Sequence, residues 1–425
     1  MTTAFPAPRI TDADLPALQR RISAVLVVGQ ILGGLGVAIG IALAPVLAAE
    51  VSGSEAVSGL APTASVAGTA LLSLPLATLM ASRGRRPGLV LGYLVGAAGA
   101  SLVVAATVTG SFPLLLLGMA GFGAGSSANL QARFAAADLA PPDRRARAIS
   151  TVIWATTIGS VLGPNVAAPA GRVFRGTPVP EAAGPFAWAA AIFLLTGLLV
   201  AVFLRPDPLL TARALAPQST GAEHRSLRAG IAAVRASPMA RLALVTVAVC
   251  HTAMVSVMVM TPVHLGHHGA DIQLIGLVIS GHIAGMYAFS PVMGRLADRF
   301  GRLSVIGLAA GLLCCATVLA GTSGGGHGRT AAGLFVLGLG WSAGLVAGSA
   351  LLTDSVPQPA RAAVQGLSDL TMNTSAGVGG AVAGLIVSGL GYGWLNAAAA
   401  CLLLPMAALA LRRAVSRPPV ASEKE

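Results

Sequence analysis

Three ionisable side chains lie inside long apolar stretches of this 425-residue sequence: His251, His282 and Asp369. If these stretches cross a membrane, the three residues are functional candidates, because a charge in the hydrocarbon region is costly. A histidine changes its protonation near neutral pH, and a carboxylate removed from water can do the same. We therefore predict that they carry protons; the alternative is that each is neutral and hydrogen-bonded to a neighbouring helix.

Polar side chains in the other apolar stretches could bind a neutral or weakly polar ligand, and Trp341 would add one flat apolar surface. The candidates for a substrate cavity are Gln30, Asn129, Gln131, Arg133, Asn165, Trp341, Asn373 and Thr374. Each of them alone could equally serve helix packing. Arg133 lies near the end of its stretch, so snorkelling to the interface or pairing with Asp138 is the favoured explanation for this residue.

One of these histidines belongs to a stripe of sulfur and imidazole groups along a predicted helix. His251, Met254 and Met258 share one helical face, and soft ligands of this kind suit copper or zinc. The same stripe is typical of flexible apolar packing, and we predict no metal site. The cysteines form neither a disulfide framework nor a zinc-ligand spacing. They are Cys250, Cys314, Cys315 and Cys401, all within apolar stretches.

The composition places these residues in membrane-spanning helices. Hydrophobic residues make up 55% of the chain and charged residues 10%, with a mean hydropathy of +0.80, whereas soluble proteins have about 25% charged residues. A spanning helix needs roughly 20 apolar residues. Twelve such stretches are predicted, at 22–48, 57–81, 88–109, 112–136, 147–170, 184–204, 240–263, 273–296, 303–321, 330–353, 362–390 and 392–411.

The basic residues orient these helices. A net charge of +12 would suggest a nucleic-acid partner for a soluble protein, but here the positions of the charges are decisive. Twenty-three of the 27 Lys and Arg residues fall on one side of the predicted membrane, and only Arg172, Arg175 and Arg329 fall on the other. Positive charge collects on the cytoplasmic side. We therefore predict a multi-pass protein of the plasma (inner) membrane with both termini in the cytoplasm.

A weak internal repeat divides the chain into two halves. The matched residues are Gly84 with Gly301, Arg85 with Arg302, Asp138 with Asp354, Pro141 with Pro357 and Arg145 with Arg361. Repeats in the same orientation are typical of transporters whose substrate site lies between the halves. The predicted organisation is a cytoplasmic tail at 1–21, a six-helix bundle at 22–204, a cytoplasmic linker at 205–239, a second six-helix bundle at 240–411 and a cytoplasmic tail at 412–425.

A charged turn between two predicted spans carries the most specific motif. The stretch 294–302 reads G-R-L-A-D-R-F-G-R and resembles the G-x-x-x-D-R-x-G-R loop signature of the major facilitator superfamily. The aspartate could pair with arginines or with a helix N-terminus, and the glycines permit a tight turn. The resemblance implies that a gate is formed by Gly294, Asp298, Arg299, Gly301 and Arg302.

The corresponding loop of the first half is incomplete. Ala81 and Ser82 stand where the superfamily usually has aspartate and arginine. The inward gate then depends on the second-half motif alone, or Asp138 or Asp143 supplies the carboxylate. The basic end of the motif is retained at Gly84, Arg85 and Arg86.

Two further motifs bear on coupling. Gly159, Gly163 and Pro164 resemble the G-x-x-x-G-P element that the superfamily carries mainly in proton-coupled exporters. The glycines make a smooth face for another helix, and the proline bends its helix. In the fourth span, Leu117 and Ala120 replace the arginine and glutamine of another superfamily signature, so the proton-linked arginine of typical exporters is absent.

The resemblance covers essentially the whole chain. It implies an all-α membrane protein of twelve transmembrane helices, in two six-helix bundles related by pseudo-two-fold symmetry. The chain is expected to be a secondary transporter that works by alternating access, not an enzyme, and the sequence contains no phosphate-binding loop for ATP. A proton gradient supplies the energy and no cofactor is expected.

Proton-coupled efflux of small hydrophobic compounds, drugs or metabolites, is the favoured function. The alternative is a proton-coupled importer of a nutrient, siderophore or related metabolite on the same fold. The expected partners are a small-molecule substrate, protons and the lipid bilayer, without nucleic acid, and a monomer suffices for this fold.

Overall fold

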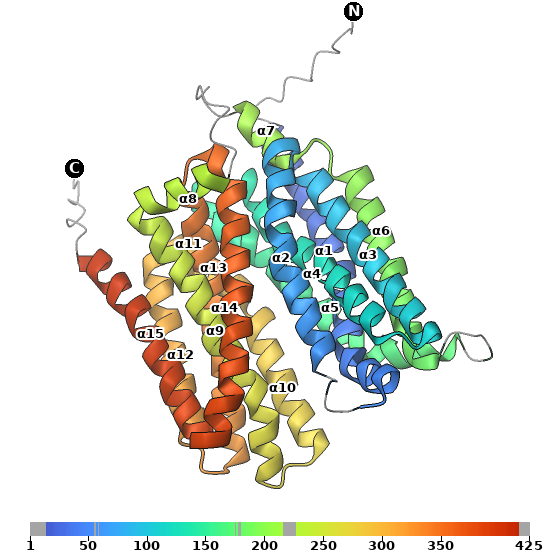
Figure 1. The fold of residues 1–425 in the computed structure, drawn as a ribbon. Coiled ribbons are helices and arrows are strands. Elements are labelled where there is room, and N and C mark those ends of the chain that lie inside the picture. The colour runs from blue at the N-terminus through green and yellow to red at the C-terminus, as the bar shows by residue number, and fades with distance from the viewer. Residues whose placement is uncertain are drawn as a thin grey trace, which may run out of the picture.

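The computed structural model describes residues 14–54, 57, 59–174, 176, 180–215 and 227–415. Within these ranges the regular elements are helices (Figure 1). They are α1 (Leu15–Ser52), α2 (Leu60–Arg83), α3 (Arg85–Thr109), α4 (Phe112–Asp138), η2 (Pro142–Arg144), α5 (Arg145–Arg172), η3 (Glu181–Ala183), α6 (Gly184–Phe203), α7 (Pro208–Leu215), α8 (Leu227–Ala236), α9 (Pro238–His267), α10 (Ile272–Tyr287), α11 (Ser290–Phe300), α12 (Arg302–Gly321), α13 (His327–Asp354), η5 (Gln358–Ala360), α14 (Arg361–Leu390) and α15 (Tyr392–Val415).

Each of the twelve predicted apolar stretches lies on helix. The first six correspond to α1 through α6, and the other six to the segments from α9 to α15. Nine helical segments of the described chain are long and apolar enough to cross a membrane by length and composition. α4, α5 and α15 are not among those nine; α4 carries buried polar residues such as Asn129 and Gln131.

Three helix ends differ from the predicted ranges. The eighth span is two helices: α10 is capped at Ala288, and α11 starts after Phe289 with Pro291 in its first turn, where a missing backbone N–H is tolerated. α1 begins at Leu15, inside the predicted tail, and the predicted linker contains α7 and α8. Helical hydrogen bonding is satisfied within the helix, so it need not stop where the apolar stretch ends.

The helices form two bundles (Figure 1). In the first, α3 packs on α4 and α6, and α1 packs on α5; in the second, α12 packs on α13, and α9 packs on α14. Small residues bring these helices close together: a Cβ on Gly121 would lie 3.1 Å from the Cα of Gly99. Such contacts replace the hydrophobic driving force that helices lack inside a lipid bilayer.

One end of the molecule carries α7 and α8 and the turns at Gly84 and Gly301. We call it the linker end; it is the upper end in Figure 1. In the described part of the chain, the side-chain hydrogen bonds that join the two bundles all lie toward this end. The bundles are therefore held closed at the linker end.

Candidate functional site

Asp298 connects the two bundles at the linker end. Its Oδ2 accepts a hydrogen bond from the backbone N–H of Arg147 at 2.9 Å, and its Oδ1 accepts one from the N–H of Ala146 at 3.2 Å. Both donors belong to the first turn of α5, where free N–H groups and the helix dipole favour an anion. The Asp298 carboxylate is 1% exposed, so little water competes for these bonds.

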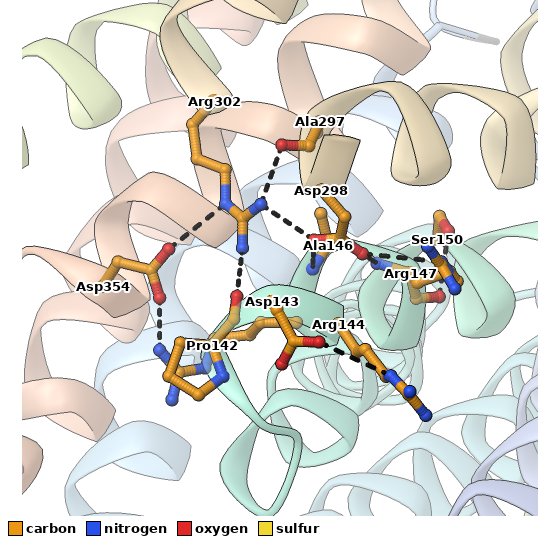
Figure 2. Close-up of polar contacts among 11 residues, drawn as sticks. Pro142, Asp143, Arg144, Ala146, Arg147, Ser150, Ala297, Asp298, Arg302 and Asp354 are labelled. Atoms are coloured by element: carbon orange, nitrogen blue, oxygen red, sulfur yellow. Dashed lines mark hydrogen bonds and ion pairs between the residues drawn. The ribbon is translucent and has the colours of Figure 1, made fainter. Parts of the chain in front are cut away.

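Arg302 and Asp354 extend this contact (Figure 2). The Arg302 guanidinium donates to Asp298 at 2.8 Å, to Asp354 at 3.2 Å and to the carbonyl of Pro142, in the other bundle, at 2.5 Å. The second oxygen of Asp354 accepts from Arg145 of α5. Each carboxylate thus binds arginine side chains or N–H groups from both bundles. Such contacts must break when the bundles separate, as a gate requires. Arg299 lies against the Phe300 ring, with 5.4 Å from its guanidinium carbon to the ring centroid.

The first half contains the equivalent ion pair but a different crossing contact. Arg85 forms a bidentate pair with Asp138, at 2.7 and 3.1 Å, and the second-half counterpart is the Arg302–Asp354 pair. Arg85 also donates across the interface to Gln365 of α14 at 2.5 Å. Of the two predicted carboxylate sources, Asp138 pairs with Arg85 inside its own bundle, while Asp143 faces solvent beside Arg144.

The turns at equivalent positions of the two halves have similar backbone conformations. Gly84 and Gly301 both have a positive φ, 96° and 87°, which glycine adopts without strain. Asp207 caps the first-half turn by accepting the N–H of Arg86 at 2.7 Å. Its carboxylate occupies the space that a side chain on Gly84 would need, so this residue completes the loop from the linker.

A second, deeper ion pair joins the bundles. Arg133 of α4 donates to Asp369 of α14 at 2.5 Å and to Ser349 of α13 at 3.3 Å. Arg133 is 2% exposed and Asp369 is 0% exposed. The predicted pairing of Arg133 with Asp138 is wrong, because Asp138 pairs with Arg85. Asp369 Oδ2 has no hydrogen-bond partner among the described residues.

The two buried histidines differ in their surroundings. His251 of α9 accepts a hydrogen bond from the Trp341 indole at 2.8 Å, and Trp341 meets the Tyr287 ring edge-on. His282 instead bonds the carbonyl of Leu334, at 2.7 Å, joining α10 to α13. It matches the structural alternative considered for the histidines.

Most other predicted cavity residues make contacts within one bundle. Gln30 donates to Thr156 at 2.8 Å, Asn129 accepts from Tyr93 at 3.0 Å, and Asn373 donates to the Asp369 carbonyl at 2.8 Å. Gln131 is fully buried with neither amide atom bonded within the described chain, and Thr374 is exposed. The side chain of Asn165 lies outside the described residues.

Gly159 and Gly163 make the smooth face that their spacing predicts. A Cβ on Gly159 would lie 2.6 Å from the backbone nitrogen of Leu35, and one on Gly163 would contact Ala38, so α5 approaches α1 closely. The side chain of Pro164 is outside the described residues. Among the residues that are described, no group of three His, Cys, Asp or Glu could hold a metal ion.

The sequence interpretation missed the functional contacts of Arg145, Asp354, Ser349 and Gln365. Arg145 and Asp354 were visible as landmarks of the internal repeat, and charged residues at repeated positions are a usable signal. Nothing in the sequence marked Gln365 and Ser349 as interface residues, because their partners lie in the other bundle.

Two helical bundles joined by polar side chains at one end define a membrane transporter built from two halves. The comparison with protein families gives the same class. The model described as Major Facilitator Superfamily matches residues 26–271 and 243–425, and the chain belongs to this superfamily. It is thus a multi-pass membrane transporter and not an enzyme, of a family that typically needs no cofactor.

Several known proteins are similar to this chain. The uncharacterised MFS-type transporter YddS of Bacillus subtilis (strain 168) is 36% identical, over 91% of this chain and 89% of its own. The riboflavin transporter RfnT of Brucella anthropi is 29% identical, over 94% of this chain and 96% of its own. A bacterial homologue of the iron transporter ferroportin, in an outward-facing state, shares the fold, with a TM-score of 0.70, 15% identity and coverage of 93% and 99%.

Proposed function

We propose that this chain is a proton-coupled secondary transporter that works by alternating access. The observation that carries the proposal is the Arg133–Asp369 ion pair between the bundles. When the linker end opens, the two residues must separate, and a buried charge without its partner is strongly unfavourable. Protonation of Asp369 removes its charge, so proton binding and opening of the linker end are thermodynamically linked.

The orientation and oligomeric state are part of this proposal. The bias of basic residues favours the linker end, and with it both termini, on the cytoplasmic side of the plasma (inner) membrane. The ion pair links two halves of one chain. A monomer therefore contains the complete pathway.

Export of small, fairly hydrophobic compounds is the direction and substrate class we favour. Gln30, Asn129 and Asn373 already have protein partners, and Arg133 is neutralised by Asp369. Arg133 would have to lose Asp369 before it could bind a charged ligand, which favours an uncharged substrate, and the amide of Gln131, unpaired within the described chain, is available for a weakly polar group on it.

Transport of a flat aromatic metabolite is the second candidate. His251, Tyr287 and Trp341 bring three rings together, with centroid distances of 5.5 and 6.0 Å from Trp341. Aromatic groups of this kind can receive a planar ligand by stacking. The similarity to a riboflavin transporter supports a flavin-like compound, and this candidate includes import.

Proton flux in proteoliposomes tests the coupling. The vesicles contain a pH-sensitive dye, and a proton gradient is imposed with a panel of lipophilic cations, neutral antibiotics, siderophores and riboflavin. Proton movement opposite to a lipophilic compound supports export. Co-movement of protons with riboflavin or a siderophore identifies an importer instead.

The coupling residue is tested with Asp369→Asn, which keeps the side-chain shape but cannot change its charge. We expect proton-linked flux to fall at least tenfold while counterflow exchange of the substrate continues. Asp143→Asn, at an exposed position of the same charge, is the matched control and should transport normally. Proton-linked flux that persists in Asp369→Asn contradicts the proposed role of this residue.

A further inference from the structure

The bundles meet along two equivalent seams at the linker end. One joins α11 to α5 and the other joins α2 to α14. In the first seam, a Cβ on Gly294 would clash with Ser150. In the second, a Cβ on Gly366 would clash with Ala77. Gly294 and Ala77 are 217 positions apart, and Gly366 and Ser150 are 216 apart, so the internal repeat relates the two contacts. The seams have the same close packing with the glycine on opposite partners.

The electrostatic contact is present in only one seam. Asp298 accepts the N–H groups of Ala146 and Arg147 at the start of α5. The repeat places Ala81 at the position of Asp298, opposite the start of α14, and Ala81 and Ala362 are buried together in an apolar cluster. An alanine cannot accept a hydrogen bond. The α2–α14 seam therefore lacks the acidic side chain that closes its counterpart.

A neutral residue makes the crossing contact in this seam. Gln365 Oε1 accepts from Arg85 at 2.5 Å, and its Nε2 donates to Thr353 of α13 at 3.2 Å. Arg85 and Gln365 are both 0% exposed, so no water replaces the bond while the seam is closed. The bond to Thr353 fixes the amide with its oxygen toward Arg85.

We infer that Gln365 is the positioning residue that closes the α2–α14 seam in place of the missing aspartate. Arg85 is already neutralised by Asp138 within its own bundle. Opening this seam breaks the Arg85–Gln365 hydrogen bond without separating Arg85 from Asp138, and farther in it separates Asp369 of α14 from Arg133. This inference rests on the alternating opening proposed above, but not on the coupling ion.

The distance between the bundles at the linker end tests the inference. Spin labels are placed by Ser82→Cys on α2 and Ala236→Cys on α8, both exposed positions, after the four native cysteines are replaced by alanine. α8 packs on α14, so the pair reports on the α2–α14 seam. Distances are measured by pulsed electron resonance in nanodiscs at one pH, without substrate or proton gradient.

Gln365→Leu should raise the ratio of open to closed molecules about tenfold, since it removes a buried hydrogen bond to a charged donor. Gln365→Glu keeps an acceptor for Arg85 and should stay closed. Ser368→Ala, on the same helix and with a buried hydroxyl lacking a partner among the described residues, is the matched control and should leave the distances unchanged.

Melting temperatures identify a variant that is merely unfolded, and the comparison is made between variants that melt within a few degrees of the parent. Unchanged distances in Gln365→Leu would overturn the inference. Equal opening in Gln365→Leu and Gln365→Glu would also overturn it, because any change of shape would then be sufficient. Neither result bears on proton coupling, which the flux of Asp369→Asn tests separately.

Discussion

Buried arginines make several of the side-chain contacts between the bundles. Arg85 and Arg133 come from the first bundle, and each is 2% exposed or less. An arginine without a partner in such a place is strongly unfavourable, yet each has a carboxylate within 2.7 Å and a further acceptor across the interface. These side chains are thereby stable in the closed state and sensitive to its opening.

Asp298 gives the sharpest prediction for a single side chain. Asp298→Asn removes the charge that holds Arg302 and the first turn of α5, and charged hydrogen bonds of this kind contribute about 1.5–3 kcal/mol each. We expect transport to fall about tenfold or more, measured as initial substrate flux in proteoliposomes. Asp143→Asn removes the same charge from an exposed position and should transport at the parent rate. Equal flux in the two variants would mean that Asp298 does not gate.

Helix α14 contributes several polar side chains to the interface between the bundles. Gln365, Asp369 and Asn373 recur every four residues, which places them on one face of the helix. The first two bond to arginines of the other bundle. Gly366 on the same helix lets α2 approach, because a larger residue would meet Ala77. One helix thus provides both the polar and the close-packed parts of the seam.

Gly366→Val tests the close approach of α2 and α14. The added side chain has no space when the linker end is closed, and overpacking of this type costs about 1–3 kcal/mol. We expect the open form to increase by tenfold or more, seen in the distance between spin labels at Ser82→Cys and Ala236→Cys. Gly384→Val lies on the same helix, where a Cβ meets no atom within 4 Å. Unchanged distances in both variants would show that the seam tolerates a larger residue.

The two bundles form one transporter through contacts concentrated at the linker end. The hydrogen bond from Ser290 to the carbonyl of Ser150 joins α11 to α5, whereas that between Thr252 and Ser375 joins helices of the same bundle. The first pair has to separate in alternating access, and the second does not. The structure therefore offers two matched places for a covalent link.

Cross-linking should distinguish these two pairs. Ser150→Cys with Ser290→Cys, oxidised in a chain without its native cysteines, is expected to reduce transport at least tenfold, with recovery after reduction. Thr252→Cys with Ser375→Cys should transport equally well when oxidised and reduced. Flux is measured in proteoliposomes, and disulfide formation is verified by thiol titration. Full transport with the first disulfide intact would exclude separation of the bundles at this place.

The sequence was sufficient for the helices, the two halves and the charged turn. A bilayer requires long apolar helices whose backbone groups are satisfied internally, and this requirement is visible along the chain. It also identified Asp369 and Asp298 as candidates, since a carboxylate in an apolar stretch or a glycine-rich turn is unusual. The break between α10 and α11 was missed, because hydropathy does not register a change in backbone conformation and other helices contain a proline without breaking.

The partners of those residues depended on the tertiary structure. Arg133 and Asp369 are 236 residues apart, and Arg85 and Gln365 are 280 apart; no helical or loop spacing relates them. The local alternative, Arg133 with Asp138, was reasonable from sequence, but packing gives that carboxylate to Arg85. A buried charge binds the opposite charge that folding brings within reach, and the packing of one bundle against the other determines which charge that is.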